Sequence, residues 1–535
     1  MRPLQNPIAF AAGKPHRVTR LLGLALGLLV LPPPLHAAPP HLVVLVTVDQ
    51  LRGDYLERYR GQWRGAFARM LSRGAVFPNA RQAHAITETA PGHATLLSGR
   101  NPAHNGIPSN YFGVPDQDFP LVGVSSGNGA SPHRFRGSTL VDWLRAKDPD
   151  SRFLSVSGKD RGAILPIGSS RGPVFWYASG RFVTSRYYAD TLPSWLTGWN
   201  ARGAVSALAG RTWTLLLPDT AYAEPDSMPF EQGGRDVTFP HRESDDPDKA
   251  MRQALGFPWM DSLTLDVALE GTRNLQLGRR RGTDVLAISL STTDYVGHEF
   301  GPDSRELHDQ LLELDRTLGW FLDSLNTLLK GQAPLVILTG DHGVTSYPEA
   351  ARLKGRPGGR VSPTVFQQRV DSELKAMGVK SPGLYFDSGL LTADLDQLRT
   401  RGLDIDSVAA ALADILKASP GVVRVYTRRT LPDSSDADAG LWRRSLPDDL
   451  PWLLCASLSP GYIWSDDTTS TTHGSTNPDD LSVPIVFMGP GVRSGIFTRS
   501  IETVDIAPTL AALLRVKPFE PLDGRAVVEV AGKGS

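Results

Sequence analysis

The chain has 535 residues, and its 56 lysine and arginine residues are balanced by 56 aspartate and glutamate residues. This neutral charge argues against a nucleic-acid-binding protein, which usually carries a basic excess. Hydrophobic residues make up 41% and charged residues 21% of the chain, as in ordinary globular proteins. The length is sufficient for a large buried core and would allow several domains.

Residues 1–37 have the pattern of a signal peptide. Lys14, Arg17 and Arg20 precede an apolar run over residues 21–31, and small residues that suit a cleavage site follow. A run of about 11 residues is typical of a signal peptide and shorter than the ~20 residues that span a membrane. An uncleaved anchor is the alternative. We expect an exported protein, periplasmic or secreted, without stable membrane insertion.

Short apolar runs alternate with helical patterns in the rest of the chain. Residues 41–49 predict a strand covered on both faces, and residues 63–74 predict a helix that ends at a glycine. Further strands are predicted from the runs RFLSVSG, DVLAISLSTTD, PLVILTGD and VPIVFMGPG. Uninterrupted runs of this kind favour a parallel sheet. Cys455, the single cysteine, lies in another apolar run, so we expect a buried thiol and no disulfide.

Two helical stretches lie between predicted strands. Apolar residues recur every three to four positions over 303–329, which predicts an amphipathic helix that crosses between two parallel strands. Residues 404–418 predict the helix of a second βαβ unit, between GLYFDS and VVRVYT. Residues 112–150 and 186–260 are rich in Pro, Gly and aromatic residues, and we interpret them as insertions at the rim of the site. We therefore expect one α/β domain over 38–535, with a mostly parallel central sheet flanked by helices.

Seven chemically reactive side chains stand where predicted strands end or in polar loops. They are Asp49, Thr89, Asp294, His298, Asp341, His342 and His473. Proteins of the α/β class build their sites at the carboxyl ends of parallel strands. Two metal ions with three protein ligands each need six residues, and an oxygen nucleophile makes the seventh. The ordered set therefore predicts a two-metal hydrolase.

The local spacing of these residues favours metal binding. Asp294 and His298 are four residues apart and can share one side of a helical turn. Asp341 and His342 are adjacent, and the glycines on either side of them permit the turn that brings both to one ion. Mixed carboxylate and imidazole ligands suit zinc, with other transition metals as alternatives. Taken alone, an aspartate at a strand end is more often a helix cap or a turn residue than a metal ligand.

The nucleophile candidate is Thr89, in TETAPGHATLLSG. A helical stretch follows it, so backbone N–H groups at the helix N-terminus would face a bound anion, although an N-cap threonine is the alternative. Asn110, in GIPSNYF, has an amide that can donate to a phosphate oxygen. Lys159 and Arg161 follow a predicted strand and can converge on one anion, whereas an exposed polar turn is the alternative.

These motifs resemble the alkaline phosphatase superfamily across nearly all of residues 38–535. The chain is most similar to the threonine-nucleophile bacterial alkaline phosphatases, the PafA-type enzymes, which are related to the nucleotide pyrophosphatase/phosphodiesterases. The motifs that carry the resemblance are, in chain order, VTVDQLRGDY, TETAPGHATLLSG, NPAHNGIPSN, SGKDRGA, STTDYVGHEFG, LTGDHGV and TTHGS.

The resemblance implies an alkaline phosphatase-like fold and two zinc ions per chain. The implied ligands are Asp294, His298 and His473 for one ion, and Asp49, Asp341 and His342 for the other, with Thr89 bridging toward the substrate. Asn110, Lys159 and Arg161 would bind the phosphoryl oxygens. His93 and His104 belong to the motifs but not to the ligand set, so we expect them to be structural.

The implied activity is the hydrolysis of small phosphate monoesters through a phospho-threonine at Thr89, with no organic cofactor. The related diesterases lack the Lys159–Arg161 pair, so its presence favours monoesters. A phosphodiesterase or nucleotide pyrophosphatase is the main alternative, on fold kinship. A sulfatase would carry Cys or Ser at position 89, because formylglycine cannot form from threonine. An exported phosphate- or metal-binding protein is the non-enzyme alternative. The sequence leaves the oligomeric state open.

Overall fold

Strand β1 (Leu42–Val48), predicted from the apolar run at 41–49, is buried along its whole length. It pairs in parallel with β9 (Asp284–Leu290) on one side and with β10 (Leu335–Thr339) on the other. Because successive side chains of a strand point to opposite faces, β1 contributes to two hydrophobic cores. Val44 and Val46 pack in one core, and Val43 and Leu45 pack in the other.

The structure is a computed structural model that describes residues 13, 39–125, 127–379 and 383–531. The signal peptide predicted at 1–37 lies outside the described residues, apart from Gly13. Within the described part, no helix combines the length and the hydropathy that a membrane span requires.

The central sheet has ten strands in the order β18-β2-β17-β10-β1-β9-β4-β5-β6-β3. The strands from β10 to β5 in this order run parallel, which confirms a mostly parallel sheet at its centre. The other strands span Ala75–Arg81 (β2), Leu121–Val122 (β3), Phe153–Ser157 (β4), Val174–Ala178 (β5), Arg181–Ser185 (β6), Ser482–Met488 (β17) and Gly495–Ile496 (β18).

The run VPIVFMGPG forms β17, but this strand is antiparallel to both of its neighbours, β10 and β2. The prediction of a parallel strand was wrong here, because a strand in the middle of a sheet is apolar on both faces whether it runs parallel or antiparallel to its neighbours. The chain enters β17 from the polar loop around residue 473 and the short helix α17 (Pro478–Leu481). That loop lies at the carboxyl edge of the parallel strands, so the next strand has to run back from this edge.

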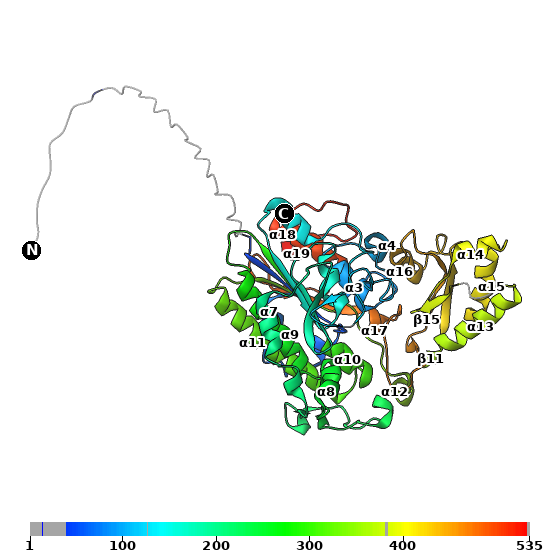
Figure 1. Ribbon diagram of the computed structural model, residues 1–535, viewed down its shortest axis with the longest axis horizontal. Coiled ribbons are helices and arrows are strands. Elements are labelled where there is room, and N and C mark those ends of the chain that lie inside the picture. Colours follow the sequence, from blue (N-terminus) through cyan, green and yellow to red (C-terminus); the bar gives the residue numbers. More distant parts are fainter. Residues whose placement is uncertain (1–12, 14–38, 126, 380–382, 532–535) are drawn as a thin grey trace, which may run out of the picture. The chain divides into compact units, whose positions relative to one another are not determined.

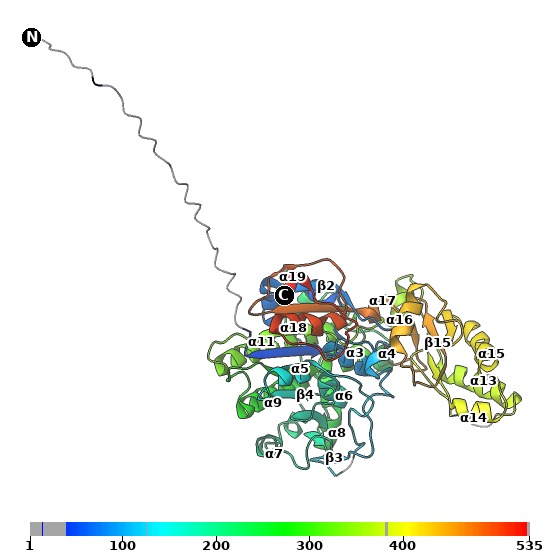
Figure 2. The ribbon, with the colours of Figure 1, turned by 90° about the horizontal axis from the view of Figure 1, so that it is seen from above.

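Helices cover both faces of the sheet (Figures 1 and 2). The helix predicted at 303–329 is α11 (Arg305–Leu328), which connects β9 to β10 as expected. It shares one core with α2 (Ala66–Arg73) and α9 (Trp259–Leu275). The helices of the other core span Thr89–Leu96 (α3), Leu140–Lys147 (α5), Asp160–Ile164 (α6) and Ile506–Leu514 (α18).

A second, four-stranded sheet has the order β12-β13-β15-β14, and every pairing in it is antiparallel. Its strands span Tyr385–Asp387 (β12), Leu390–Thr392 (β13), Val422–Thr427 (β14) and Trp452–Leu458 (β15). The helices α13 (Pro363–Ala376), α14 (Leu395–Thr400) and α15 (Ile405–Lys417) gather around β15 in both views (Figures 1 and 2). Cys455 lies in β15 and is buried, as predicted.

The second βαβ unit predicted around 404–418 is therefore wrong, although its helix exists as α15. β12 does not lead into that helix but turns straight back into β13 through Ser388 and Gly389. Both residues have positive φ angles, 48° and 80°, which is the backbone of a tight two-residue hairpin turn. The sequence pattern showed a helix between two strands but not the additional hairpin strand.

The two regions interpreted as insertions contain only short elements. Residues 112–150 form β3 and α5, and α5 packs into a main core through Leu140 and Trp143. Residues 186–260 form α7 (Ser194–Ala201), α8 (Pro247–Gln253), several single turns and a two-stranded sheet, β7 (Thr212–Trp213) with β8 (His241–Arg242).

Candidate functional site

The predicted site residues gather at the carboxyl edge of the parallel strands. Asp49 directly follows β1, and Lys159 follows β4. Asp341 comes two positions after β10, and α10 (Thr292–Glu299), which carries Asp294 and His298, follows β9. The strand ends share this edge because the four strands are parallel neighbours.

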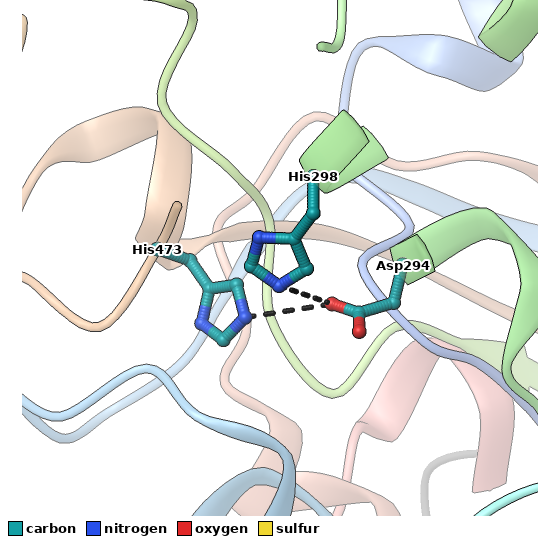
Figure 3. Close-up of side chains that lie close together, drawn as sticks. All are labelled: Asp294, His298 and His473. Carbon is teal, nitrogen blue, oxygen red and sulfur yellow. Dashed lines mark ion pairs between the residues drawn. The ribbon is translucent and has the colours of Figure 1, made fainter. Parts of the chain in front are cut away.

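The first group of potential metal ligands is Asp294, His298 and His473, whose ligand atoms all lie within 4.8 Å of one another. His298 Nε2 is 3.3 Å and His473 Nε2 is 3.4 Å from Oδ1 of Asp294. Figure 3 shows both imidazole rings directed at this one carboxylate oxygen. Asp294 and His298 share a turn of α10, as their spacing predicts. His473 comes from a polar loop far away in the sequence.

The second group is Asp49, Asp294 and His342. His342 Nε2 is 3.4 Å from Oδ1 of Asp49 and 3.5 Å from Oδ2 of Asp341. This grouping differs from the expected set, because Asp294 belongs to both groups and Asp341 lies at the border of the second. The six predicted ligands nevertheless form one continuous cluster.

Three backbone carbonyl groups orient the histidines of this cluster. Nδ1 of His298 lies 2.7 Å from the carbonyl oxygen of Thr471, and Nδ1 of His473 lies 2.7 Å from that of Thr87. Nδ1 of His342 lies 2.9 Å from the carbonyl oxygen of Gly343. A carbonyl oxygen can only accept, so each Nδ1 carries the proton and each Nε2 presents a lone pair to the cluster. This is the arrangement that a metal-binding histidine needs.

The charges of the cluster also fit a bound cation. Burial, followed by the neighbouring Asp294 and Asp341, raises the pKa of Asp49. Burial acts in the same direction on Asp294, but Lys159 and His298 outweigh it and hold the pKa of Asp294 well below its ordinary value. Oδ1 of Asp49 has no hydrogen-bond partner among the described residues, whereas its Oδ2 pairs with the ammonium group of Lys159. Several buried carboxylates this close together are costly unless cations compensate them.

Thr89 is buried at the first position of α3, and this helix packs against Asp341 of the cluster. A Cβ atom at Gly92 would be 2.3 Å from the carbonyl oxygen of Asp341, so only glycine lets α3 approach the end of β10 this closely. His93 lies between the same two elements. Its Nδ1 is 2.9 Å from the carbonyl oxygen of Thr89 and 3.2 Å from Oδ2 of Asp341.

The three residues expected to bind phosphate lie in different environments. The backbone N–H of Ala90 donates to Oδ1 of Asn110 over 2.8 Å, which ties Asn110 to the start of α3. Lys159 is buried, and its Nζ is 2.5 Å from a carboxylate oxygen of both Asp49 and Asp294. Arg161 is half-buried and lies 3.5 Å from the carboxylate of its neighbour Asp160.

His104, the other motif histidine, lies outside the cluster. Its side chain is 59% exposed and pairs with Asp523 over 2.9 Å. His104 therefore belongs to neither group of potential ligands, and a structural role for it stays a prediction.

Gln50 is a site residue that the sequence analysis missed. Its backbone N–H donates to Oδ1 of Asp341 over 3.0 Å, and its side-chain amide donates to Oδ1 of Asp294 over 2.9 Å. It is buried and has a φ angle of 66°, a conformation that costs a non-glycine residue roughly 1 kcal/mol and is concentrated at functional sites. A Cβ atom at Gly297 would lie 1.8 Å from Oε1 of Gln50, so this glycine leaves room for the amide.

We expect Gln50→Ala to weaken divalent metal binding by about 10- to 100-fold, because residues that orient metal ligands typically contribute this much. Competition with a chelator of known affinity measures the change. Gln368→Ala, on the exposed side of α13, is the matched control. Equal metal affinity of Gln50→Ala and the wild type would show that Gln50 does not orient the ligands.

Three comparisons place the chain among known proteins. The sequence model described as "Type I phosphodiesterase / nucleotide pyrophosphatase" matches residues 43–475. The alkaline phosphatase PhoV of Synechococcus elongatus is 32% identical, over 93% of this chain and 94% of its own. The crystal structure of wild-type alkaline phosphatase PafA superposes with a TM-score of 0.85 at 29% identity, covering 92% of this chain and 99% of that chain.

A second PafA structure has the same TM-score and coverage at 28% identity. It is a variant with substitutions at a threonine, an asparagine, a lysine and an arginine. The threonine and the asparagine are 21 positions apart, and the lysine and the arginine are two positions apart. Thr89 and Asn110, and Lys159 and Arg161, have the same spacings in this chain.

Proposed function

The chain belongs to the type I phosphodiesterase / nucleotide pyrophosphatase family, and on this premise we propose that it is an exported alkaline phosphatase that hydrolyses phosphate monoesters through Thr89. The observation that carries the proposal is the convergence of both ligand groups, Lys159 and the N-terminus of α3 at one edge of the sheet. The similarity to alkaline phosphatases over nearly the whole chain supports it. The signal peptide predicted at 1–37 supports a periplasmic or secreted location.

The donor set suits two zinc ions. Asp294, His298 and His473 would hold one, and Asp49, Asp341 and His342 the other, with the carboxylate of Asp294 near both. When bound, the ions supply Lewis acidity, which favours the alkoxide form of a nearby hydroxyl and neutralises charge on the reacting oxygens. The lone pairs at Nε2 support this assignment, and so does Oδ1 of Asp49, which has no hydrogen-bond partner among the described residues.

The phosphoryl group is transferred twice, first to Thr89 and then to water. The hydroxyl oxygen of Thr89 attacks phosphorus, a bond from threonine to phosphorus forms, and the bond from phosphorus to the leaving alcohol breaks. Water then hydrolyses the phospho-threonine, which releases inorganic phosphate and restores the hydroxyl. The N-terminus of α3 would face the phosphoryl group, and the helix dipole favours its negative charge. The N–H of Ala90 donates to Asn110 and that of Gly92 to the carbonyl oxygen of Glu88, so these two groups hold the helix start rather than the phosphate.

Asn110, Lys159 and Arg161 would bind the phosphoryl oxygens. Because Oδ1 of Asn110 already accepts from Ala90, its NH₂ group is the part left to donate to substrate. Lys159 brings its charge into the buried cluster, and Arg161 adds a second charge from the half-buried rim. A monoester has one more unesterified oxygen than a diester, so two cations beside the phosphoryl group favour monoesters.

We expect the double variant Lys159→Ala with Arg161→Ala to lower kcat/KM for a monoester by roughly 10²-fold or more, as loss of oxyanion donors does. Turnover of a diester should fall much less, because a diester lacks the oxygen that the pair would contact. Initial rates on aryl phosphate mono- and diesters measure both effects, with bound metal determined in parallel. Lys375→Ala with Arg369→Ala, on the exposed side of α13, is the charge-matched control.

Equal losses on the two esters would remove the main support for a monoesterase. The family name makes phosphodiesterase the second candidate function, and faster turnover of the diester by the wild type would favour it. A metal-loaded protein that hydrolyses no phosphate or sulfate ester would instead be a binding protein.

A further inference from the structure

Glu88, the residue directly before Thr89, occupies the N-cap position of α3 but does not cap that helix. Its side chain is buried and accepts two hydrogen bonds from elsewhere. The backbone N–H of Asn110 donates to Oε2 over 2.6 Å, and the hydroxyl of Ser388 donates to Oε1. The Glu88 carboxylate thus makes no hydrogen bond to the N–H groups of α3. It instead links two segments, around residues 110 and 388, that are far apart in the sequence.

Asn110 is consequently held at two points. Its backbone N–H donates to Glu88, and its side-chain oxygen accepts from Ala90. Together the two bonds fix both the position of the residue and the rotation of its amide, so that the NH₂ group faces away from α3's own backbone. Without the bond to Glu88, the side chain would keep its contact with Ala90, and the backbone would keep only the bond from the N–H of Gly113 to the carbonyl oxygen of Asn110.

Ser388 brings the second sheet into this arrangement. It lies in the turn between β12 and β13 and has a φ angle of 48°, a strained conformation for a residue with a side chain. The same hairpin makes a second contact with the Asn110 segment, because the Tyr385 ring stacks on Tyr111 with centroids 4.0 Å apart. Asp387 lies beside Glu88 and completes the polar cluster.

We propose that Glu88 and Ser388 are positioning residues for the phosphoryl group, and that they act through Asn110. The hairpin at residues 385–392 thereby becomes part of the phosphate-binding site, although its sheet supplies none of the proposed metal ligands. This role presupposes the proposed function, since it requires Asn110 to bind the phosphoryl group.

A double-mutant cycle between Glu88 and Asn110 tests this role. We expect Glu88→Ala to lower kcat/KM for a monoester and to weaken inhibition by inorganic phosphate, each roughly 10-fold or more, as loss of a charge-assisted hydrogen bond does. In a background of Asn110→Ala the same substitution should change either quantity by less than about twofold, because the residue it positions is already absent. Glu88→Gln should retain most activity, since its amide oxygen still accepts from Asn110 and its NH₂ can donate to Asp387.

Ser388→Ala removes only a hydroxyl. If Glu88→Ala fails to fold, Ser388→Ala replaces it in the double-mutant cycle with Asn110→Ala. Ser372→Ala, at an exposed serine of α13, is its control. Thermal melting and metal content of each variant identify losses due to folding or to the metal ions. Multiplicative losses in the cycle, with wild-type enzyme active, would overturn the positioning role alone. An inactive wild type would instead overturn the proposed function.

Discussion

Thr89→Ala is expected to lower kcat/KM for a phosphate monoester by roughly 10³-fold or more, because knocking out an enzyme nucleophile removes the covalent route altogether. Thr89 is buried at the start of α3, and alanine retains the Cβ atom and the helix-forming backbone there. The variant should therefore fold and bind metal like the wild type. Steady-state kinetics, thermal melting and metal analysis of the same preparation separate these effects.

Thr89→Ser supplies the matched comparison, since it preserves the hydroxyl and removes only a methyl group. It should keep measurable turnover. Acid quenching during turnover of a ³²P-labelled monoester should leave the label on a peptide that contains Thr89. A label on another residue, or wild-type turnover by Thr89→Ala, would show that Thr89 is not the nucleophile.

Removal of the metal ions is the second large effect that we expect. A chelator should abolish activity, and added zinc should restore it, because two metal ions stabilise the charge on both the attacking and the leaving oxygen. His473→Ala should lose metal from one site, whereas Asp294→Ala should lose metal from both, since Asp294 belongs to both ligand groups. Elemental analysis of the purified variants measures the stoichiometry.

His104→Ala is the control for these substitutions, because this histidine is exposed and pairs with Asp523 outside the cluster. It should retain full metal content and activity. Full activity in a demonstrably metal-free sample would contradict the metal assignment. Equal metal loss in His473→Ala and Asp294→Ala would show that Asp294 serves one site only.

The sequence was informative where chemistry depends on short-range spacing. Asp294 and His298 share a helical turn because they are four residues apart, and Asp49 ends a strand because the apolar run stops there. The order of strands along one sheet edge then brings such residues together. Parallel strands and the crossover helix α11 were predicted for the same reason, since burial on two faces and a helical repeat both leave local patterns.

The roles of Gln50 and Glu88 could not be predicted, because their partners are distant in the sequence. Gln50 contacts Asp294 and Asp341, and Glu88 contacts Ser388, through hydrogen bonds that leave no periodic trace. The direction of β17 and the second sheet were missed for a related reason. An apolar run records that a strand is covered, not which strand lies beside it or which way it runs.

The hairpin that carries Ser388 has a natural reporter. Leu390 of β13 is paired with Cys455, which is also paired with Tyr426 of β14, so the one thiol of the chain lies in the middle of the second sheet. A buried thiol reacts with a reagent in water only when its surroundings open. The rate of Cys455 labelling therefore measures how often the strands of this sheet separate. Slower labelling in the presence of phosphate would show that phosphate binding stabilises the hairpin, and no engineered probe is needed.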